Sequence, residues 1–181
     1  MKHKNPLDRY AADLPEGHVQ WIGVRPERKA DLNAVAAVEA VAGLGLTGDH
    51  RMTKTPGSGR QVTIISQEFI DQIAQFTGHE KIEPGTLRRN IVVQGINLNA
   101  LRRQRFYVGN ALFEATQLCH PCARMEMALG KGGVAAMMGH GGLCARILKG
   151  GDIRLGDSIR VDNAAESDAS LSQPPAQAEL I

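Results

Sequence analysis

Short apolar stretches bounded by glycine, proline or polar residues recur along the chain, and this pattern predicts many short β-strands. The stretches lie at residues 17–24, 61–65, 87–93, 106–108, 111–116, 143–148, 153–155 and 158–161. The pair Gly109-Asn110 separates two of them and suits the tight two-residue turn of a β-hairpin. The strand that follows this turn delivers the segment beginning at Cys119 to the end of the hairpin.

Two stretches have the pattern of α-helices, and a third is ambiguous. Residues 67–76 follow Ser66, a good N-cap residue, and residues 123–129 form a short run of helix-forming residues that ends at glycines. Residues 30–42 are rich in alanine and carry valines three apart, which favours a helix, but the valines also permit a strand. The first helix has an apolar face that should pack on the core, formed by Phe69, Ile70, Ile73 and Phe76.

Many strands, glycine turns and few helices predict a mainly β protein with a few helices (α+β), built as a partly closed β-barrel. A chain of 181 residues is most simply one domain. We expect a flexible N-terminal segment at residues 1–18, the domain at residues 19–162 and a disordered tail at residues 163–181. The tail is rich in alanine, serine, glutamine, proline and acidic residues, which have little to pack.

Charge and cysteine content narrow the class of protein. With 21 Lys and Arg against 19 Asp and Glu, the net charge of +2 argues against a general nucleic-acid binder. The N-terminus lacks the apolar run of a signal peptide, and no stretch approaches the roughly 18 apolar residues of a membrane span. Three cysteines are too few for a disulfide framework. We therefore expect a cytoplasmic protein with reduced thiols and no membrane or nucleic-acid partner.

The segment 119–146 concentrates the chemistry of the chain, because it holds all three cysteines, two histidines and many glycines. Cys119 and Cys122 fall between a strand end and a helix start, where backbone N–H groups and nearby Arg124 should favour a thiolate. Three interpretations remain open. In the first, the Cys-x-x-Cys pair is a redox pair. In the second, a structural zinc ion is bound by Cys119, Cys122, His140 and Cys144. In the third, one cysteine is a reactive or metal-binding thiolate, and the other cysteines are buried small hydrophobic residues.

Five motifs, in order along the chain, resemble the MOSC domain, which is named after the C-terminal part of molybdenum cofactor sulfurase. They are the residues 45–49 (GLTGD), 60–65 (RQVTII), 88–95 (RRNIVVQG), 119–124 (CHPCAR), and 141–146 (GGLCAR) with 151–157 (GDIRLGD). The resemblance covers about residues 20–162 and implies a β-rich barrel. It also favours a strand for residues 30–42.

The resemblance implies a molybdenum–pterin cofactor (molybdopterin), with Cys122 as the metal ligand and the catalytic position. A soft thiolate suits a sulfur-rich metal site. The resemblance further suggests Arg89 and Arg124 as partners of the pterin phosphate, and Asn90 and His120 as hydrogen-bonding residues. Many relatives carry a basic residue directly after the Asp of GLTGD, whereas this chain has His50 before Arg51, so neither is assigned a role.

The activity implied by the resemblance is reduction of N-hydroxylated compounds, such as hydroxylamines and amidoximes, by a molybdenum-dependent oxidoreductase. Electrons would come from a separate flavin reductase or iron–sulfur protein. The alternative is a non-catalytic molybdenum cofactor carrier or a sulfur-transfer module in which Cys122 holds a persulfide. No lysine-bearing domain for pyridoxal phosphate is recognisable in the sequence.

Overall fold

The structure, a computed structural model, describes residues 6–163. Its strands are β1 (Gly17–Val24), β2 (Asn33–Ala34), β3 (Ala37–Val41), β4 (Gly45–Leu46), β5 (Val62–Ser66), β6 (Ile91–Gln94), β7 (Arg105–Val108), β8 (Ala111–Leu118), β9 (Leu143–Lys149), β10 (Gly151–Arg154) and β11 (Ser158–Val161). Its α-helices are α1 (Gln67–Thr77), α2 (Ala123–Leu129) and α3 (Gly133–Ala136), and its 3-10 helices are η1 (Pro6–Asp13), η2 (His50–Thr53), η3 (Pro84–Leu87) and η4 (Leu98–Leu101).

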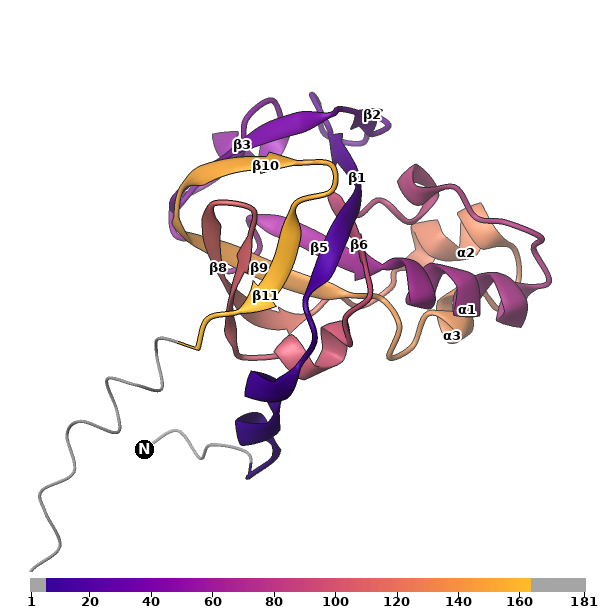
Figure 1. The fold of residues 1–181 in the computed structure, drawn as a ribbon. Helices are drawn as coiled ribbons and strands as arrows, with labels where there is room; N and C mark the ends of the chain where they lie inside the picture. Colours follow the sequence, from indigo (N-terminus) through magenta and orange to yellow (C-terminus); the bar gives the residue numbers. More distant parts are fainter. Residues whose placement is uncertain (1–5, 164–181) are drawn as a thin grey trace, which may run out of the picture.

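Seven strands form a closed barrel in the order β11-β7-β8-β9-β5-β6-β1 (Figure 1). The barrel closes where β1 pairs with β11, through Gly17 opposite Ile159 and His18 opposite Ser158. Neighbouring strands are antiparallel except β5 and β6, which are parallel and joined through α1. The predicted mainly β barrel is thus confirmed, and it is fully closed. Hydrophobic periodicity could not show this, because it does not tell which edge strands meet.

The ambiguous stretch at residues 30–42 contains strands β2 and β3, so the strand interpretation is confirmed. β3 lies between β10 and β4 in a second, three-stranded sheet. Along β3, Val38 and Ala40 are buried while Ala37 and Glu39 are exposed, which is the period-two alternation of a half-buried strand. Pairing with β10 therefore outweighs the helix preference of the alanines.

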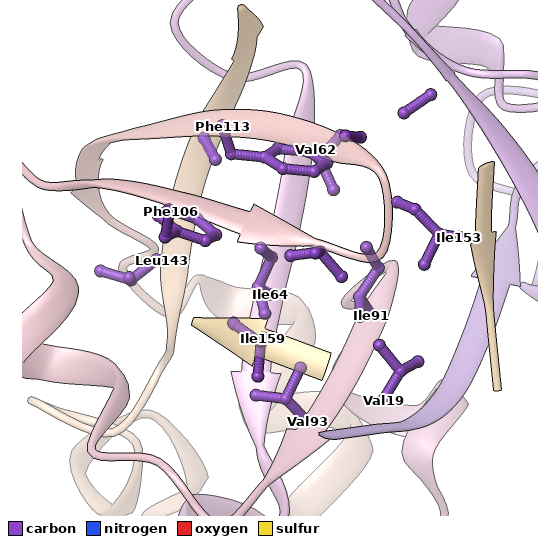
Figure 2. Close-up of a cluster of buried hydrophobic side chains, with 14 of the residues drawn as sticks. Val19, Val62, Ile64, Ile91, Val93, Phe106, Phe113, Leu143, Ile153 and Ile159 are labelled. Atoms are coloured by element: carbon purple, nitrogen blue, oxygen red, sulfur yellow. The ribbon is translucent and has the colours of Figure 1, made fainter. Parts of the chain in front are cut away.

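The barrel interior is filled by inward-facing aliphatic and aromatic side chains (Figure 2). Phe106 on β7 and Phe113 on β8 stack with their ring centroids 5.7 Å apart. Around them lie Val19, Val62, Ile64, Ile91, Val93, Leu143, Ile153 and Ile159, all of them buried. Because strand residues fill this core, polar residues of the connecting loops are available for a functional site.

The three α-helices gather on one side of the barrel, next to β5 and β6 (Figure 1). On α1, Ile70 and Ile73 are buried in a second apolar cluster, as predicted. Phe76 was expected on the same core-facing stripe, but its side chain is 58% exposed. It lies in the last turn of α1 and contacts the edge of the His140 ring instead of the core.

Ser66 caps α1, and we predict a modest stability loss when this cap is removed. Its hydroxyl accepts a hydrogen bond from the backbone N–H of Phe69, at 3.2 Å. Ser66→Ala should lower the free energy of unfolding by about 1 kcal/mol, measured by urea unfolding. Ser158→Ala, on a strand, removes a hydroxyl that caps no helix and should cost less. An equal loss in both variants would contradict the capping role.

Part of the segment predicted to be flexible has regular structure. Residues 6–13 form η1, where Ala11 is buried, and Gly17 and His18 already belong to β1. Residues 1–5 and 164–181, including nearly all of the predicted tail, lie outside the described residues. Within residues 6–163, no helix has the length and apolar character needed to cross a membrane.

Candidate functional site

Five loops meet beside strands β5 and β6, and they carry most of the residues that the sequence singled out. They follow β1, precede β5, β6 and β9, and follow β8. β6 and β9 both begin opposite Ile64 of β5, at Ile91 and Leu143, so the loops that precede them adjoin although β9 runs antiparallel to β5. β8 ends at Leu118, opposite Leu143, which brings the loop after it to the same place. Hydrogen bonds between the loops, described below, hold them together.

Asp49 organises the first two loops from a buried position. Its carboxylate accepts hydrogen bonds from the backbone N–H of Arg25 at 3.0 Å, the backbone N–H of Arg51 at 3.0 Å and the side-chain amide of Asn90 at 2.8 Å. Only 4% of Asp49 is exposed. A buried carboxylate with three donors is a fixed negative charge, and it holds the backbone of two arginines in place.

Asn90, predicted to contact the cofactor, is the second centre of this network. Its amide group donates to Asp49 and to the carbonyl of Gly23, while its oxygen accepts from the backbone N–H and the hydroxyl of Thr63. These four bonds use both amide hydrogens and both lone pairs of the oxygen. Asn90 therefore supports the loops, and contact with a ligand would require breaking one of these bonds.

Arg89, predicted to bind the pterin phosphate, is buried and donates to three backbone carbonyls. These are Gly141 at 2.7 Å, Leu87 at 2.7 Å and Cys119 at 3.3 Å. Burial lowers the pKa of its guanidinium, and the negative charge of the neighbouring Cys119 opposes this effect. In the structure Arg89 ties the loop before β6 to the loops that follow β8 and precede β9.

Cys119 is a buried thiol surrounded by donors. Its sulfur accepts a hydrogen bond from Arg60 Nη2 at 3.2 Å, and its backbone N–H donates to the Gly142 carbonyl at 2.8 Å. A hydrogen bond from the Cys144 thiol lowers the pKa of Cys119, and the charges of Arg89 and Arg60 add to this effect, while burial opposes it. The same contact and burial raise the pKa of Cys144. The proton of this pair therefore stays on Cys144.

Cys122, the predicted metal ligand, is exposed and stands at the N-cap position of α2. Its carbonyl accepts a hydrogen bond from the Met125 N–H at 2.7 Å, which fixes the backbone beside the thiol. His120, close to it in the sequence, is also exposed, and Arg124 in the first turn of α2 is half-buried. These three predicted residues are thus open to a ligand, in contrast to Arg89 and Asn90.

The loops also bring together arginines whose charges act on one another. Burial is the main cause that lowers the pKa of Arg25, and the charges of Arg88, Arg51 and Arg124 lower it further. Burial and the charge of Arg60 likewise lower the pKa of Arg51. Together with Arg89 they form what we call the arginine cluster: Arg25, Arg51, Arg60, Arg88, Arg89 and Arg124.

Two donors of the arginine cluster are unused. The Nε atoms of Arg25 and Arg51 are buried and have no hydrogen-bond partner among the described residues. Only 7% of Arg25 is exposed. Buried donors without a partner are costly, so the cluster is suited to an anion that accepts hydrogen bonds from them.

Sequence reasoning missed Arg25, Asp49, Arg51 and Arg60. The last three lie within or next to the motifs at residues 45–49 and 60–65, but nothing in the spacing showed that Arg60 reaches Cys119. Arg25 directly follows the strand expected at residues 17–24 and gave no signal of its own.

Two of the earlier interpretations of the cysteines lose support. Within the described part of the chain, no three His, Cys, Asp or Glu side chains are grouped so that they could hold a metal ion, so the zinc interpretation finds no support there. His140 instead contacts Phe69 and Phe76 edge-on. The Cys-x-x-Cys segment follows an antiparallel hairpin rather than a strand of a βαβ unit, and all three cysteines are free.

A hollow of about 540 Å³ lies on the outer face of β8 and β9. The Thr116 hydroxyl at its edge is within hydrogen-bond distance of the carbonyls of Gly59 and Cys144, so the hollow adjoins the loop that carries Arg60. Its lining residues are Arg103, Glu114, Ala115, Thr116 and Arg146.

Comparison with known proteins agrees with this architecture. The sequence model of the MOSC domain matches residues 49–160, more than half of the chain. Comparison with curated proteins gives no significant match. The matched region leaves out β1, although β1 closes the barrel and precedes Arg25.

Solved structures with the same fold come from several bacteria. The YuaD protein from Bacillus subtilis is 19% identical and has a TM-score of 0.69, covering 82% of this chain and 96% of that one. YiiM from Geobacillus stearothermophilus is 17% identical with a TM-score of 0.63, covering 87% and 92%. YiiM from Escherichia coli is 16% identical with a TM-score of 0.60, covering 81% and 70%. At these identities the likeness concerns the fold.

Proposed function

The chain belongs to the MOSC domain family, whose domains are associated with the molybdenum cofactor, and we propose that it binds a molybdenum–pterin cofactor where the five loops meet. One observation carries the proposal: buried, unpaired guanidinium nitrogens of Arg25 and Arg51 lie in an arginine cluster that also surrounds thiols. A pterin phosphate would supply the missing acceptor, and a cysteine would supply the metal ligand.

The residues divide into those that would hold the cofactor and those that support them. Cys122 is our choice for the metal ligand because its thiol is exposed, whereas Cys119 and Cys144 are buried. Arg25 and Arg51 would hold the phosphate with Arg124. His120, exposed in the loop before Cys122, can hold a proton at either ring nitrogen.

Arg89 and Asn90, by contrast, would act through the backbone that they fix. Arg89 orients the loops at Cys119 and Gly141, and Asn90 holds Asp49. We therefore place the phosphate contacts on Arg25 and Arg51 in preference to Arg89.

The reaction that we propose is the reduction of N-hydroxylated compounds, such as hydroxylamines and amidoximes. When bound, the cofactor supplies two-electron chemistry that removes the substrate oxygen. The chain's own residues would bind and orient the cofactor and provide protons at the open side of the site. Electrons would come from a separate flavin or iron–sulfur protein.

The test is metal and pterin analysis of the protein purified from a host that makes the cofactor. We expect molybdenum and pterin in the wild type and loss of molybdenum in Cys122→Ser, with an unchanged circular dichroism spectrum. Met127→Ala is the control, because Met127 lies on the same helix and is 78% exposed. Wild-type protein without molybdenum, or a Cys122→Ser variant that retains it fully, would refute the assignment.

A carrier or sulfur-transfer role is the alternative, and the exposure of the Cys122 thiol favours it equally, since an acceptor protein could reach it. Turnover of a hydroxylamine with a reconstituted electron donor separates the two roles. No turnover in fully loaded protein would reject the reductase, and a persulfide on Cys122, seen by mass spectrometry, would support sulfur transfer.

A further inference from the structure

The proposed function gives Cys119 no role, although its thiol is buried and accepts a hydrogen bond from an arginine, whereas the thiol of Cys122 is exposed. The thiol is 1% exposed and lies at the end of β8. Arg60 donates to its sulfur, Arg89 donates to its carbonyl, and Gly142 accepts from its N–H. Only the bond from Arg60 reaches the side chain, and a packed small hydrophobe would not need that contact.

The positive charges of the arginine cluster repel one another, and two negative groups, Asp49 and Cys119, offset this repulsion. The charge of the Asp49 carboxylate raises the pKa of Arg25 and of Arg51, against the effect of burial. For Arg60 and Arg89, the negative groups that act most strongly are cysteines, with Cys119 first. Partial burial lowers the pKa of Arg60, yet the charges of Cys119 and Cys144 and the hydrogen bond to Cys119 raise it overall.

The loop that carries Arg60 is fixed at its end by Gln61, whose N–H donates to the Ala145 carbonyl at 3.0 Å and whose side-chain oxygen accepts from the Ile147 N–H at 2.8 Å. Before Gln61 it is attached by few contacts. Arg51 Nη1 donates to the Arg60 carbonyl at 3.2 Å, and the Thr116 hydroxyl lies near the Gly59 carbonyl. The Gly57 N–H donates to the Gly43 carbonyl at 2.9 Å. Residues 54–61 form neither helix nor strand, so the bond from Arg60 to Cys119 is the side-chain contact that joins this loop to the thiol-bearing loop.

We propose that Cys119 is a positioning residue: a buried thiolate that pairs with Arg60 and thereby holds residues 54–61 over the arginine cluster. The proposal deepens the proposed function, since Arg60 acts electrostatically on Arg51, one of the residues that we propose to hold the phosphate. Cys119 would thus set the position of one arginine of the cofactor site without touching the cofactor.

The charged and titratable groups that face Cys119 are Arg60 from the loop before β5, Arg89 from the loop before β6 and Cys144 from β9. The two guanidiniums and the Cys144 proton all favour the thiolate. The negative charge of the side chain at position 119, and not only its size, should therefore decide whether Arg60 is held in place.

The first measurement is the thiolate absorbance near 240 nm as a function of pH, on the full chain without cofactor. We expect one thiolate that titrates well below the ordinary range of a thiol in the wild type and in Cys122→Ser, and its absence in Cys119→Ser. Arg60→Met should move this titration towards higher pH. An unchanged titration in Cys119→Ser, or in Arg60→Met, would overturn the proposal.

The second measurement is hydrogen–deuterium exchange of residues 54–61. Exchange should be several-fold faster in Cys119→Ser and in Arg60→Met, and slow again in Cys119→Asp, which restores a negative charge at the same place. Equal exchange in wild type and Arg60→Met, or equally fast exchange in Cys119→Asp and Cys119→Ser, would contradict the charge-based role. If the Cys119 variants do not fold, the Arg60 variant alone decides.

These results do not depend on bound molybdenum. The proposed function alone would be refuted by protein that never contains the cofactor but in which Cys119 titrates at low pH and residues 54–61 exchange slowly. Cofactor-loaded protein whose Cys119 titrates as an ordinary thiol would refute the positioning role alone.

Discussion

Gly142→Ala should destabilise the protein by more than about 4 kcal/mol, or prevent folding. A Cβ at this position would lie 2.0 Å from the Ile64 carbonyl oxygen, which belongs to the β5 backbone and cannot move away cheaply. The φ angle of +82° adds the cost of a left-handed conformation, about 1–2 kcal/mol. Because Gly142 also accepts the hydrogen bond from Cys119, the change would displace the thiol-bearing loop.

Gly139→Ala is the matched control for this prediction. Gly139 has nearly the same φ, +80°, but an added Cβ would meet no atom within 4 Å. We expect a loss of about 1–2 kcal/mol there, from the backbone conformation alone. Urea unfolding of both variants gives the comparison, and similar losses at the two glycines would show that the contact with Ile64 is not what requires Gly142.

Asp49→Ala should cost about 3–5 kcal/mol, because it removes the partner of buried charges and leaves buried donors unpaired. The donors are the backbone N–H groups of Arg25 and Arg51 and the amide of Asn90. The guanidiniums of Arg25 and Arg51 also lose their carboxylate. Urea unfolding measures the change in stability, and molybdenum content should fall with it.

Two further variants sharpen the Asp49 prediction. Asp49→Asn keeps the shape but turns an amide group towards donors, so it should remain clearly destabilised. Asp71→Ala, on the exposed face of α1, removes only a hydrogen bond from Gln67 and should stay within about 0.5 kcal/mol of the wild type. A loss at Asp49 no larger than at Asp71 would mean that the loops hold together without this carboxylate.

Local pattern was sufficient for most of the secondary structure. The hairpin turn at Gly109-Asn110, the cap at Ser66 and the helix after Cys122 depend on neighbours in the sequence, and the structure has all three. The accessibility of the two cysteines did not follow from the pattern, since both lie between a strand end and a helix start, yet Cys119 is buried and Cys122 is exposed. Phe76 shows the limit, since periodicity gives the face of a helix but not where the core beneath it ends.

Residues 30–42 show a second limit. Their alanines and valines suit either a helix or a strand, and pairing of Val38 with Ile153, far along the chain, decides for the strand. The closure of the barrel has the same origin, because β1 and β11 come from opposite ends of the domain.

The sequence by itself determined most of the strands, the helices α1 and α2, the family motifs and the thiol-rich segment. Only the tertiary structure decided which polar residues support the site and which face it. Asn90 meets Asp49 across 41 positions, Arg89 meets Cys119 across 30, and Arg60 meets Cys119 across 59. Such contacts depend on how the barrel brings its loops together, and no local spacing encodes them, so the buried pairing of Cys119 with Arg60 became visible only in the folded chain.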